Sequence, residues 1–343
     1  MGAFDLHKIP QSTGGNLVAL VKLTRLQNVG TLRTDFTVWY RTAVVLKFHL
    51  DGNFSTIYVC MFCEEVIEKA MSVAYTARQQ IDSIDVNSSG QRIVIGLSSL
   101  EGNTWDGGLK LLSNEGAELL SKYSPCGISM VRFSGPRLLL AARDDGDVVM
   151  YSSDKLEEMQ VFGIHDDIVS CVADDPHNES HFASCGWDGN IYIWDWRLHT
   201  SKQAPVTSYI NAHSGHINDI KYSPFDQNIL SSVGQDGLLR IWDKRQSPSS
   251  GCASIINIGQ SCSCLSYENA DENVILVGTD SGDISVIDPR GTKPILLSTK
   301  IHQGRIRKIS PSQAVSNIFL CASDDATYTI CTRGSESIIE KKR

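Results

Sequence analysis

A short pattern that recurs five times constrains this chain more than any other feature of its sequence. Each copy joins two short apolar runs through a turn, as in residues 141–151 and 184–195. The turn positions, spaced by 43, 48, 45 and 44 residues, are Gly146, Gly189, Gly237, Gly282 and Ala326. A fixed period of this length indicates tandem copies of one structural unit, each too small to bury its apolar side chains alone. We therefore expect a repeat array.

A second pattern keeps the same period. Three histidines, each followed by a short apolar run that ends at a proline, are His165, His213 and His302. Asp-Gly at the turns favours tight hairpins with positive φ. Short apolar runs that do not alternate with polar residues are typical of strands covered on both faces. The sequence predicts an all-β chain whose repeat unit is a four-stranded antiparallel sheet.

These copies resemble WD repeats, and the resemblance implies a β-propeller. It also implies a buried hydrogen-bonded chain within a blade, made by the histidine, the turn aspartate, a serine and the tryptophan of the Trp-Asp pair. The residues at these positions are His165, Ser184, Asp188 and Trp194 in one copy and His213, Ser232, Asp236 and Trp242 in the next.

A catalytic role for His165 with Asp188 is the alternative reading of the same residues. We favour the structural role, because a buried histidine without partners costs about 1–3 kcal/mol. In the copy that contains Gly282, Ser281 and Ile287 replace the turn aspartate and the tryptophan. There we expect the network to be absent or filled by water.

Six blades can be counted between residues 77 and 343, and residues 36–62 have the pattern of a hairpin that could supply a seventh. An unrelated leader is equally compatible with these residues. We therefore divide the chain into residues 1–76, an N-terminal segment of uncertain structure and possibly a partial blade, and residues 77–343, the WD-repeat β-propeller. The expected ring has six visible blades, and seven if the N-terminal segment contributes.

The charge of the chain is unevenly distributed. The net charge is −8, yet residues 144–188 alone hold twelve acids and one base, Lys155. Such a surface repels phosphate backbones and attracts basic protein tails, so we expect no direct nucleic-acid binding. The alternative is that the acids are solvated loop ends. The candidate substrate patch is formed by Asp144, Asp145, Asp147, Asp166 and Asp167.

Motifs for catalysis are missing from the sequence: it contains no phosphate-binding loop, no dinucleotide fingerprint and no nucleophile elbow. Cys60 and Cys63 have the spacing of a metal or redox pair, but no second pair accompanies them. We expect no cofactor, no metal and no enzymatic activity. The ten cysteines are expected to be buried thiols, and neither a signal peptide nor an apolar run of membrane-spanning length is evident.

Residues 98–108 separate two expected strands, residues 91–97 and 109–112, by eleven residues where other copies use about four. We expect a loop that projects from the face bearing the histidine loops, with Trp105 at its tip among Asn103, Thr104 and Asp106. This stretch and residues 165–170 resemble the methylosome WD-repeat subunit, the partner of the symmetric-dimethylating protein arginine methyltransferase. The first 76 residues do not share that resemblance.

This resemblance implies a non-catalytic role in cytoplasm and nucleus, with Trp105 bound to the methyltransferase catalytic subunit. It also implies that the chain presents Arg-rich substrates such as histone or Sm-protein tails. Two Asp-x-Arg pairs, Asp195 with Arg197 and Asp243 with Arg245, suggest an alternative role as substrate receptor of a cullin-RING ubiquitin ligase. A generic WD-repeat scaffold is the third possibility.

Overall fold

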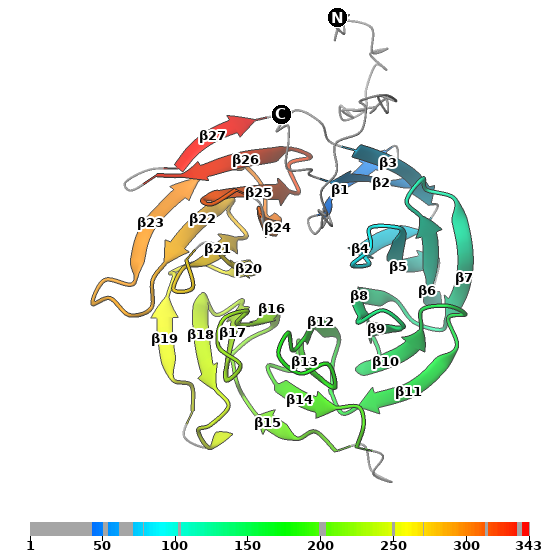
Figure 1. Cartoon of the computed structure of the whole chain (residues 1–343), viewed down its shortest axis with the longest axis horizontal. Coiled ribbons are helices and arrows are strands. Elements are labelled where there is room, and N and C mark those ends of the chain that lie inside the picture. The colour runs from blue at the N-terminus through cyan, green and yellow to red at the C-terminus, as the bar shows by residue number, and fades with distance from the viewer. Residues whose placement is uncertain are drawn as a thin grey trace, which may run out of the picture.

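The computed structural model describes residues 43–50, 54–61, 71–77, 79–101, 104–198, 204–248, 251–269, 271–312, 315–334 and 338–342. These residues form antiparallel sheets arranged in a ring, and the first strand of each sheet lies nearest the centre (Figure 1). Six of the described sheets have four strands and one has three. The fold is a WD-repeat β-propeller, as the repeat pattern predicts.

The strands follow one another around the ring in chain order. The three-stranded sheet contains β1 (Ala43–Leu50), β2 (Phe54–Met61) and β3 (Met71–Ala77). The next two blades contain β4 (Gln80–Val86), β5 (Arg92–Glu101), β6 (Thr104–Ser113) and β7 (Glu118–Ser124), then β8 (Ile128–Ser134), β9 (Leu138–Arg143), β10 (Asp147–Ser152) and β11 (Glu158–Gly163).

The following two blades contain β12 (Val169–Asp174), β13 (His181–Gly186), β14 (Ile191–Asp195) and β15 (Thr207–Tyr209), then β16 (Ile217–Tyr222), β17 (Ile229–Gly234), β18 (Leu238–Asp243) and β19 (Ser254–Asn257). The last two contain β20 (Cys262–Tyr267), β21 (Ile275–Thr279), β22 (Asp283–Ile287) and β23 (Ile295–Lys300), then β24 (Ile306–Pro311), β25 (Ile318–Ser323), β26 (Tyr328–Arg333) and β27 (Ile338–Lys342).

The three-stranded sheet lies between the β24–β27 blade and the β4–β7 blade (Figure 1). Strands β1 and β2 pair antiparallel from Ala43 opposite Met61 to Leu50 opposite Phe54. The hairpin proposed for residues 36–62 also includes residues 36–42, 51–53 and 62, which lie outside the described residues. With β1–β3 included, the described ring has seven sheets.

The five recurring turns adopt the backbone conformation that their residues favour. Gly146, Gly189, Gly237 and Gly282 have φ between 73° and 93°, the region open to glycine. Ala326 takes the same conformation at φ 63° although it carries a Cβ. Each turn joins the second and third strands of its blade, so a common turn geometry repeats around the ring.

The core lies between blades rather than within them. In the β12–β15 blade, Phe182 and Trp194 pack against Phe162 of the preceding blade, while Ile191 packs against Ile217 of the following one. All five of these side chains are buried. Because each sheet is covered on both faces, its strands are apolar runs without alternation.

Polar side chains on the inner strands join consecutive blades. In four cases, the second residue of an inner strand donates a side-chain hydrogen bond to the first backbone carbonyl of the next inner strand. The bonds run from Ser129 to Val169, Ser170 to Ile217, Asn218 to Cys262 (2.7 Å) and Ser263 to Ile306 (2.6 Å). These contacts fix the angular position of each blade relative to its neighbour.

Candidate functional site

The hydrogen-bonded chain implied by the repeat is present in the β12–β15 blade. His165 Nδ1 lies 2.9 Å from Asp188 Oδ2, and His165 Nε2 lies 2.9 Å from Ser184 Oγ. Trp194 Nε1 donates to the same hydroxyl at 2.9 Å. When Nδ1 carries the ring proton and donates it in a hydrogen bond to Asp188, Nε2 accepts a hydrogen bond from Ser184. Every polar side-chain atom of this His–Asp–Ser–Trp network that is buried then has a partner. The His165 side chain is fully buried, and the Ser184 hydroxyl occupies its Nε2.

The β16–β19 blade repeats this arrangement with the same geometry. His213 binds Asp236 at 2.9 Å and Ser232 at 2.8 Å, and Trp242 donates to Ser232 at 2.9 Å. Burial raises the pKa of Asp236, but the hydrogen bond from His213 and two backbone N–H groups outweigh it and hold the pKa below its usual value. Hydrogen bonds from His165 and Asn190 lower the pKa of Asp188 in the same way, against the effect of burial. Both aspartates are therefore fixed structural anions.

Two blades depart from the complete chain. In the last blade, His302 binds Asp325 at 3.1 Å, but Cys321 occupies the serine position and the buried His302 Nε2 has no hydrogen-bond partner. In the β20–β23 blade the network is replaced, because the Ser281 hydroxyl bonds to Gln260 Oε1 and lies 2.5 Å from Asp283. The network of histidine, aspartate, serine and tryptophan is thus absent from this blade, which is one of the two expected outcomes, and other polar side chains form hydrogen bonds at the turn.

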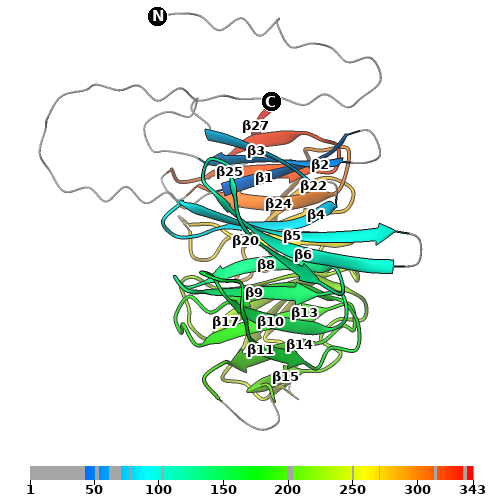
Figure 2. The same ribbon diagram turned by 90° about the vertical axis from the view of Figure 1, so that its right-hand side faces the viewer.

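The insertion at residues 98–108 is not the loop that the sequence suggests. Strands β5 and β6 continue pairing through it, from Leu97 opposite Gly108 to Glu101 opposite Thr104. The hairpin extends beyond the ends of the other strands (Figure 2). Regular cross-strand hydrogen bonds satisfy the backbone of the extension, which explains why it forms strands. A paired hairpin holds Trp105 in one orientation.

Trp105 lies on β6 near the tip of this hairpin, opposite Leu100. Its side chain is 46% exposed, and its indole N–H donates to Asp144 Oδ2 at 2.7 Å. Gly127 permits this contact, because a Cβ there would overlap Asp144 Oδ2 and lie 2.7 Å from Trp105 Nε1. The indole ring of Trp105 is thus held through its N–H edge, while much of its surface faces solvent.

The other residues expected at the tip are placed less completely. Asn103 lies outside the described residues, and of Thr104 only the strand backbone is described. Asp106 is half-buried on β6, opposite Ser99. Leu100, which the sequence reading overlooked, is 61% exposed. Its position across from Trp105 gives the hairpin tip a second large apolar side chain, and alternation along β5 could have revealed it.

The acidic candidates lie beside the same hairpin. Asp144 and Asp145 form the β9–β10 turn, and a Cβ at Gly146 in that turn would contact the carbonyl oxygens of His165 and Asp167. Asp166 and Asp167 are exposed in the adjoining loop. We name this surface, formed by Trp105, Asp106, Asp144, Asp145, Asp147, Asp166 and Asp167, the hairpin face. The structure brings the aromatic and acidic candidates together.

The carboxylates of the hairpin face influence one another. Burial raises the pKa of Asp144, and the negative charges of Asp82 and Asp145 raise it further against the hydrogen bond from Trp105. Burial and Asp145 also raise the pKa of Asp147, although Arg143 opposes them. Arg143 pairs with Asp145. A cationic side chain placed here would relieve this mutual repulsion.

Another aromatic side chain on this end of the ring was not anticipated. Trp187 precedes the turn aspartate of the β12–β15 blade and is 41% exposed. Its ring stacks on His216 with centroids 4.5 Å apart and an interplanar angle of 3°. Its position in a turn beside Asp188 was the available sequence signal.

The Asp-x-Arg pairs lie at the opposite end of the blades. Asp243 binds the Arg245 guanidinium at 2.7 Å within its own loop, and Asp288 binds Arg290 at 2.8 Å. The Arg197 guanidinium lies 5.3 Å from the centre of the Trp196 ring instead. Each arginine is held by its own loop, so local turn stabilisation accounts for the pattern.

The cysteines of the described residues form no further site. Cys60 is described only as part of strand β2, and Cys63 lies outside the described residues. Seven of the eight cysteines with described side chains are buried, and all eight are free thiols. Among the residues with described positions, no three His, Cys, Asp or Glu side chains are grouped to hold a metal. The same part of the chain has no helix able to span a membrane.

Comparison with protein families agrees with this geometry. Residues 156–195 and 204–243 match the family model described as WD domain, G-beta repeat. The two matched segments end at the third strands of the β12–β15 and β16–β19 blades, which carry the two complete hydrogen-bonded chains. Propellers of this kind typically act as protein-interaction scaffolds.

Proposed function

The chain is a WD-repeat protein, and we propose that it serves as the non-catalytic subunit of a protein arginine methyltransferase complex. In this proposal the tip of the β5–β6 hairpin binds the methyltransferase catalytic subunit. The acidic part of the hairpin face receives Arg-rich substrates such as histone or Sm-protein tails. The complex acts in cytoplasm and nucleus, and the chain contacts neither membranes nor nucleic acid directly.

The observation that supports the proposal most is the fixed and exposed position of Trp105. An aromatic side chain that is already oriented loses little conformational entropy on binding, and tryptophan is the residue most enriched at interface hot spots. The Asp144 hydrogen bond and the paired strands supply that orientation.

The charge of the hairpin face supports the second half of the proposal. Asp166 and Asp167 are exposed, and within the described residues Asp145 pairs with one cation, Arg143, which lies beside the same turn. Arginine side chains bind carboxylates with two parallel hydrogen bonds, so an Arg-rich tail suits this surface chemically. A substrate bound here would lie next to a catalytic subunit docked on the hairpin.

Affinity purification of the full chain from cells tests the proposal directly. We expect a protein arginine methyltransferase to copurify with the wild-type chain. Recovery of a cullin-RING adaptor without a methyltransferase would favour the role of a ligase substrate receptor. Recovery of neither would leave the chain as a scaffold for other partners and contradict the proposal.

A further inference from the structure

A cavity of about 420 Å³ lies where the β12–β15 and β16–β19 blades meet, at the end of the ring that carries the turns between second and third strands. These two blades are neighbours in the ring (Figure 1). One wall is the β13–β14 turn, residues 187–189, and the other is the loop of residues 211–215. Arg240 of β18 completes the lining. The volume falls within the range of about 300–1,000 Å³ that is typical of ligand pockets.

Both walls of this cavity are fixed by their own contacts. The N–H of Asn211 donates to Asn190 Oδ1 at 2.9 Å, and the N–H of His213 donates to the Gly189 carbonyl oxygen at 3.2 Å. Gly189 permits the close approach of the loop, because a Cβ there would lie 2.8 Å from the His213 carbonyl oxygen. These contacts exist without a ligand, so the cavity is preformed, as binding sites usually are.

Trp187 gives the cavity an aromatic surface. Its indole stacks in parallel on His216, and the side chain is nevertheless 41% exposed. The stacking covers one face of the indole and holds it in one orientation, so the exposed part is available to a second flat or apolar group. Such a group would pack on Trp187 without the cost of ordering it.

Arg240 is the cation of this cavity, and within the described residues it forms no ion pair. The side chain is half-buried; its Nε has no hydrogen-bond partner, and its Nη1 contacts the Cys252 sulfur at 3.9 Å. Asp188 lines the same cavity, but its two oxygens accept hydrogen bonds from His165, from the N–H of Asp166 and from Asn190. A guanidinium group has five N–H donors, so Arg240 lacks acceptors.

The repeat itself shows that a blade does not need an arginine at this position. Arg240 lies three residues after the turn glycine and opposite Ser232 on the second strand. The other blades with a recurring turn have buried, uncharged side chains there: Val149, Tyr192, Ser285 and Thr329. The pairing register places Lys110 at this position in the β4–β7 blade, and Glu118 pairs with it at 2.7 Å. Among these six blades, only Arg240 carries a charge here that no acid of the described chain balances, which is costly at a half-buried site.

We propose that this cavity binds a carboxylate or phosphate group of a partner protein, carried on a flat or apolar stem. The oxyanion accepts paired hydrogen bonds from the Arg240 guanidinium, whose planar fork fits both groups. The stem packs on Trp187. The net charge of −8 opposes non-specific binding of anions, so retention of an anion depends on this site. The site takes the charge opposite to that of an Arg-rich tail and is independent of the methyltransferase proposal.

NMR of the full chain with ¹⁵N-labelled tryptophan provides the test, because the indole signal of Trp187, assigned from Trp187→Phe, reports on the cavity. The probes are phenyl phosphate and benzoate, and benzylammonium is the matched control with a similar ring and the opposite charge. We expect a saturable shift of the Trp187 signal with at least one of the anions and none with benzylammonium. Tighter binding of phenyl phosphate would indicate a phosphorylated side chain as the ligand, and tighter binding of benzoate a carboxylate.

Three variants separate Arg240 from general electrostatics. Arg240→Gln should weaken the anionic probe about tenfold, because hydrogen bonds to a charged group are lost. Arg240→Lys keeps the charge without the planar fork and should have an intermediate affinity. Arg245→Gln is the matched control, since the Arg245 guanidinium is already paired with Asp243, and it should leave the affinity unchanged.

The thermal midpoint of Arg240→Gln should not fall, because the replacement removes an unpaired charge from a half-buried site. The inference is overturned if neither anion causes a saturable shift or if benzylammonium binds as tightly. It is also overturned if Arg245→Gln weakens binding as much as Arg240→Gln does, or if Arg240→Gln binds the probe normally and unfolds at a lower temperature.

Discussion

The Ser184 hydroxyl has two partners in the buried chain of the β12–β15 blade, His165 Nε2 and Trp194 Nε1. Ser184→Ala would leave both nitrogens buried without a partner. We expect the variant to lose about 2–4 kcal/mol of unfolding free energy. Thermal and denaturant unfolding measure this loss. Ser214→Ala is the matched control, since Ser214 is exposed, and it should change stability by less than about 0.5 kcal/mol.

If Ser184→Ala lost no more unfolding free energy than the control, water would be replacing the hydroxyl. The hydrogen-bonded network would then not be essential for stability. His302 shows what an incomplete chain looks like, because its Nε2 is buried without a partner where the serine position holds cysteine. The fold tolerates this one incomplete network. We expect each complete network to contribute more to the free energy of unfolding.

Asp325 in the same blade predicts a dependence on acid pH. Burial raises its pKa, but hydrogen bonds from Thr327 and from two backbone N–H groups outweigh it and lower the pKa to about 2. A carboxylate with a lowered folded pKa stabilises the fold above pH about 4, and this stabilisation is lost as the pH falls to about 2. Asp325→Asn should therefore unfold at a lower temperature at neutral pH, with a shallower decline between pH 4 and 2.

Thermal midpoints measured from pH 2 to 7 test this prediction, with Asp167→Asn as a control on an exposed carboxylate. Parallel curves for wild type and Asp325→Asn would show that Asp325 does not contribute in this pH range. The sign is fixed by the direction of the pKa shift, so a steeper decline in the variant would also contradict the account.

Among the strands, the β5–β6 hairpin is the element whose length most needs explanation. Beyond Ser98 and Gly107 it extends past neighbouring blades, so its tip contributes little to the core (Figure 2). Replacing residues 99–106 with Asn-Gly would close the hairpin by a two-residue turn that suits strand twist. We expect the shortened protein to keep its thermal midpoint and to lose methyltransferase binding.

Calorimetry and a binding assay on the same preparation decide this prediction. A large drop in thermal midpoint would show that the extension supports the ring. Retained binding with an unchanged midpoint would place the methyltransferase contact elsewhere on the chain.

The hairpin also shows where sequence reasoning succeeds and fails. The regular period of turn glycines was sufficient to predict the blades, because it depends on local pattern. The residues of the two complete hydrogen-bonded chains followed from the resemblance to WD repeats. The extension was misread because Gly107 and Gly108 and several polar residues look like a loop. Cross-strand pairing, which decides the outcome, leaves little trace in one sequence.

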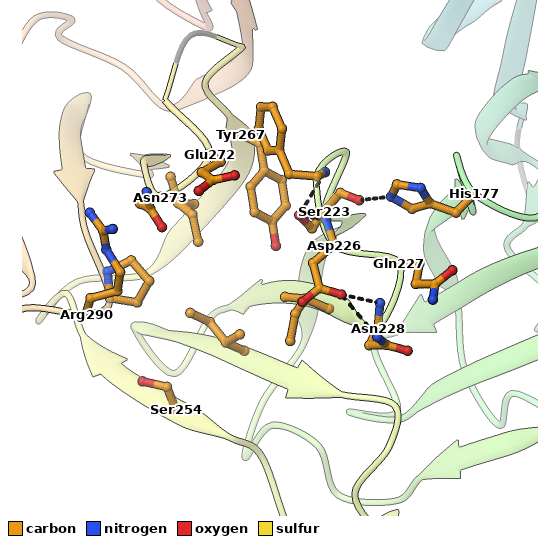
Figure 3. Close-up of a pocket in the computed structure, with 15 residues that line it drawn as sticks. His177, Ser223, Asp226, Gln227, Asn228, Ser254, Tyr267, Glu272, Asn273 and Arg290 are labelled. Atoms are coloured by element: carbon orange, nitrogen blue, oxygen red, sulfur yellow. Dashed lines mark hydrogen bonds between the residues drawn. The ribbon is translucent and has the colours of Figure 1, made fainter.

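Contacts between residues far apart in the sequence could not be predicted for a different reason. Trp105 and Asp144 are 39 residues apart, and their hydrogen bond depends on the missing side chain of Gly127. The acidic residues were identified from composition alone, but their position beside the hairpin follows from how two blades pack. The pocket drawn in Figure 3 is lined by Ile241 of one blade and Tyr267 of the next, so no single repeat contains its signal.

The molecule as a whole is a ring of blades joined by inner-strand hydrogen bonds and carries a net charge of −8. On the hairpin face the acids are concentrated, so binding of an Arg-rich histone peptide should depend strongly on salt. The Debye length falls from about 10 Å at 0.1 M to about 3 Å at 1 M. We expect the affinity to fall steeply over this range, as titration calorimetry can measure.

Replacing Asp144, Asp145 and Asp147 with asparagine should remove most of that salt dependence and weaken the binding of the peptide. Asp226→Asn, on the opposite end of the ring, is the control and should leave both unchanged. Affinity that is insensitive to salt, or that survives the triple replacement, would refute the assignment of this surface to basic tails.

The most direct test of the proposed function is the dissociation constant of the methyltransferase for Trp105→Ala. The account predicts binding weaker by roughly 30-fold, the loss typical of a hot-spot tryptophan. The thermal midpoint should stay the same, because Trp105 lies on the exposed hairpin tip and its one described polar contact is with Asp144. Trp187→Ala removes an exposed tryptophan of another blade and should bind normally. Wild-type affinity for Trp105→Ala, or a large loss of its thermal stability, would contradict the account.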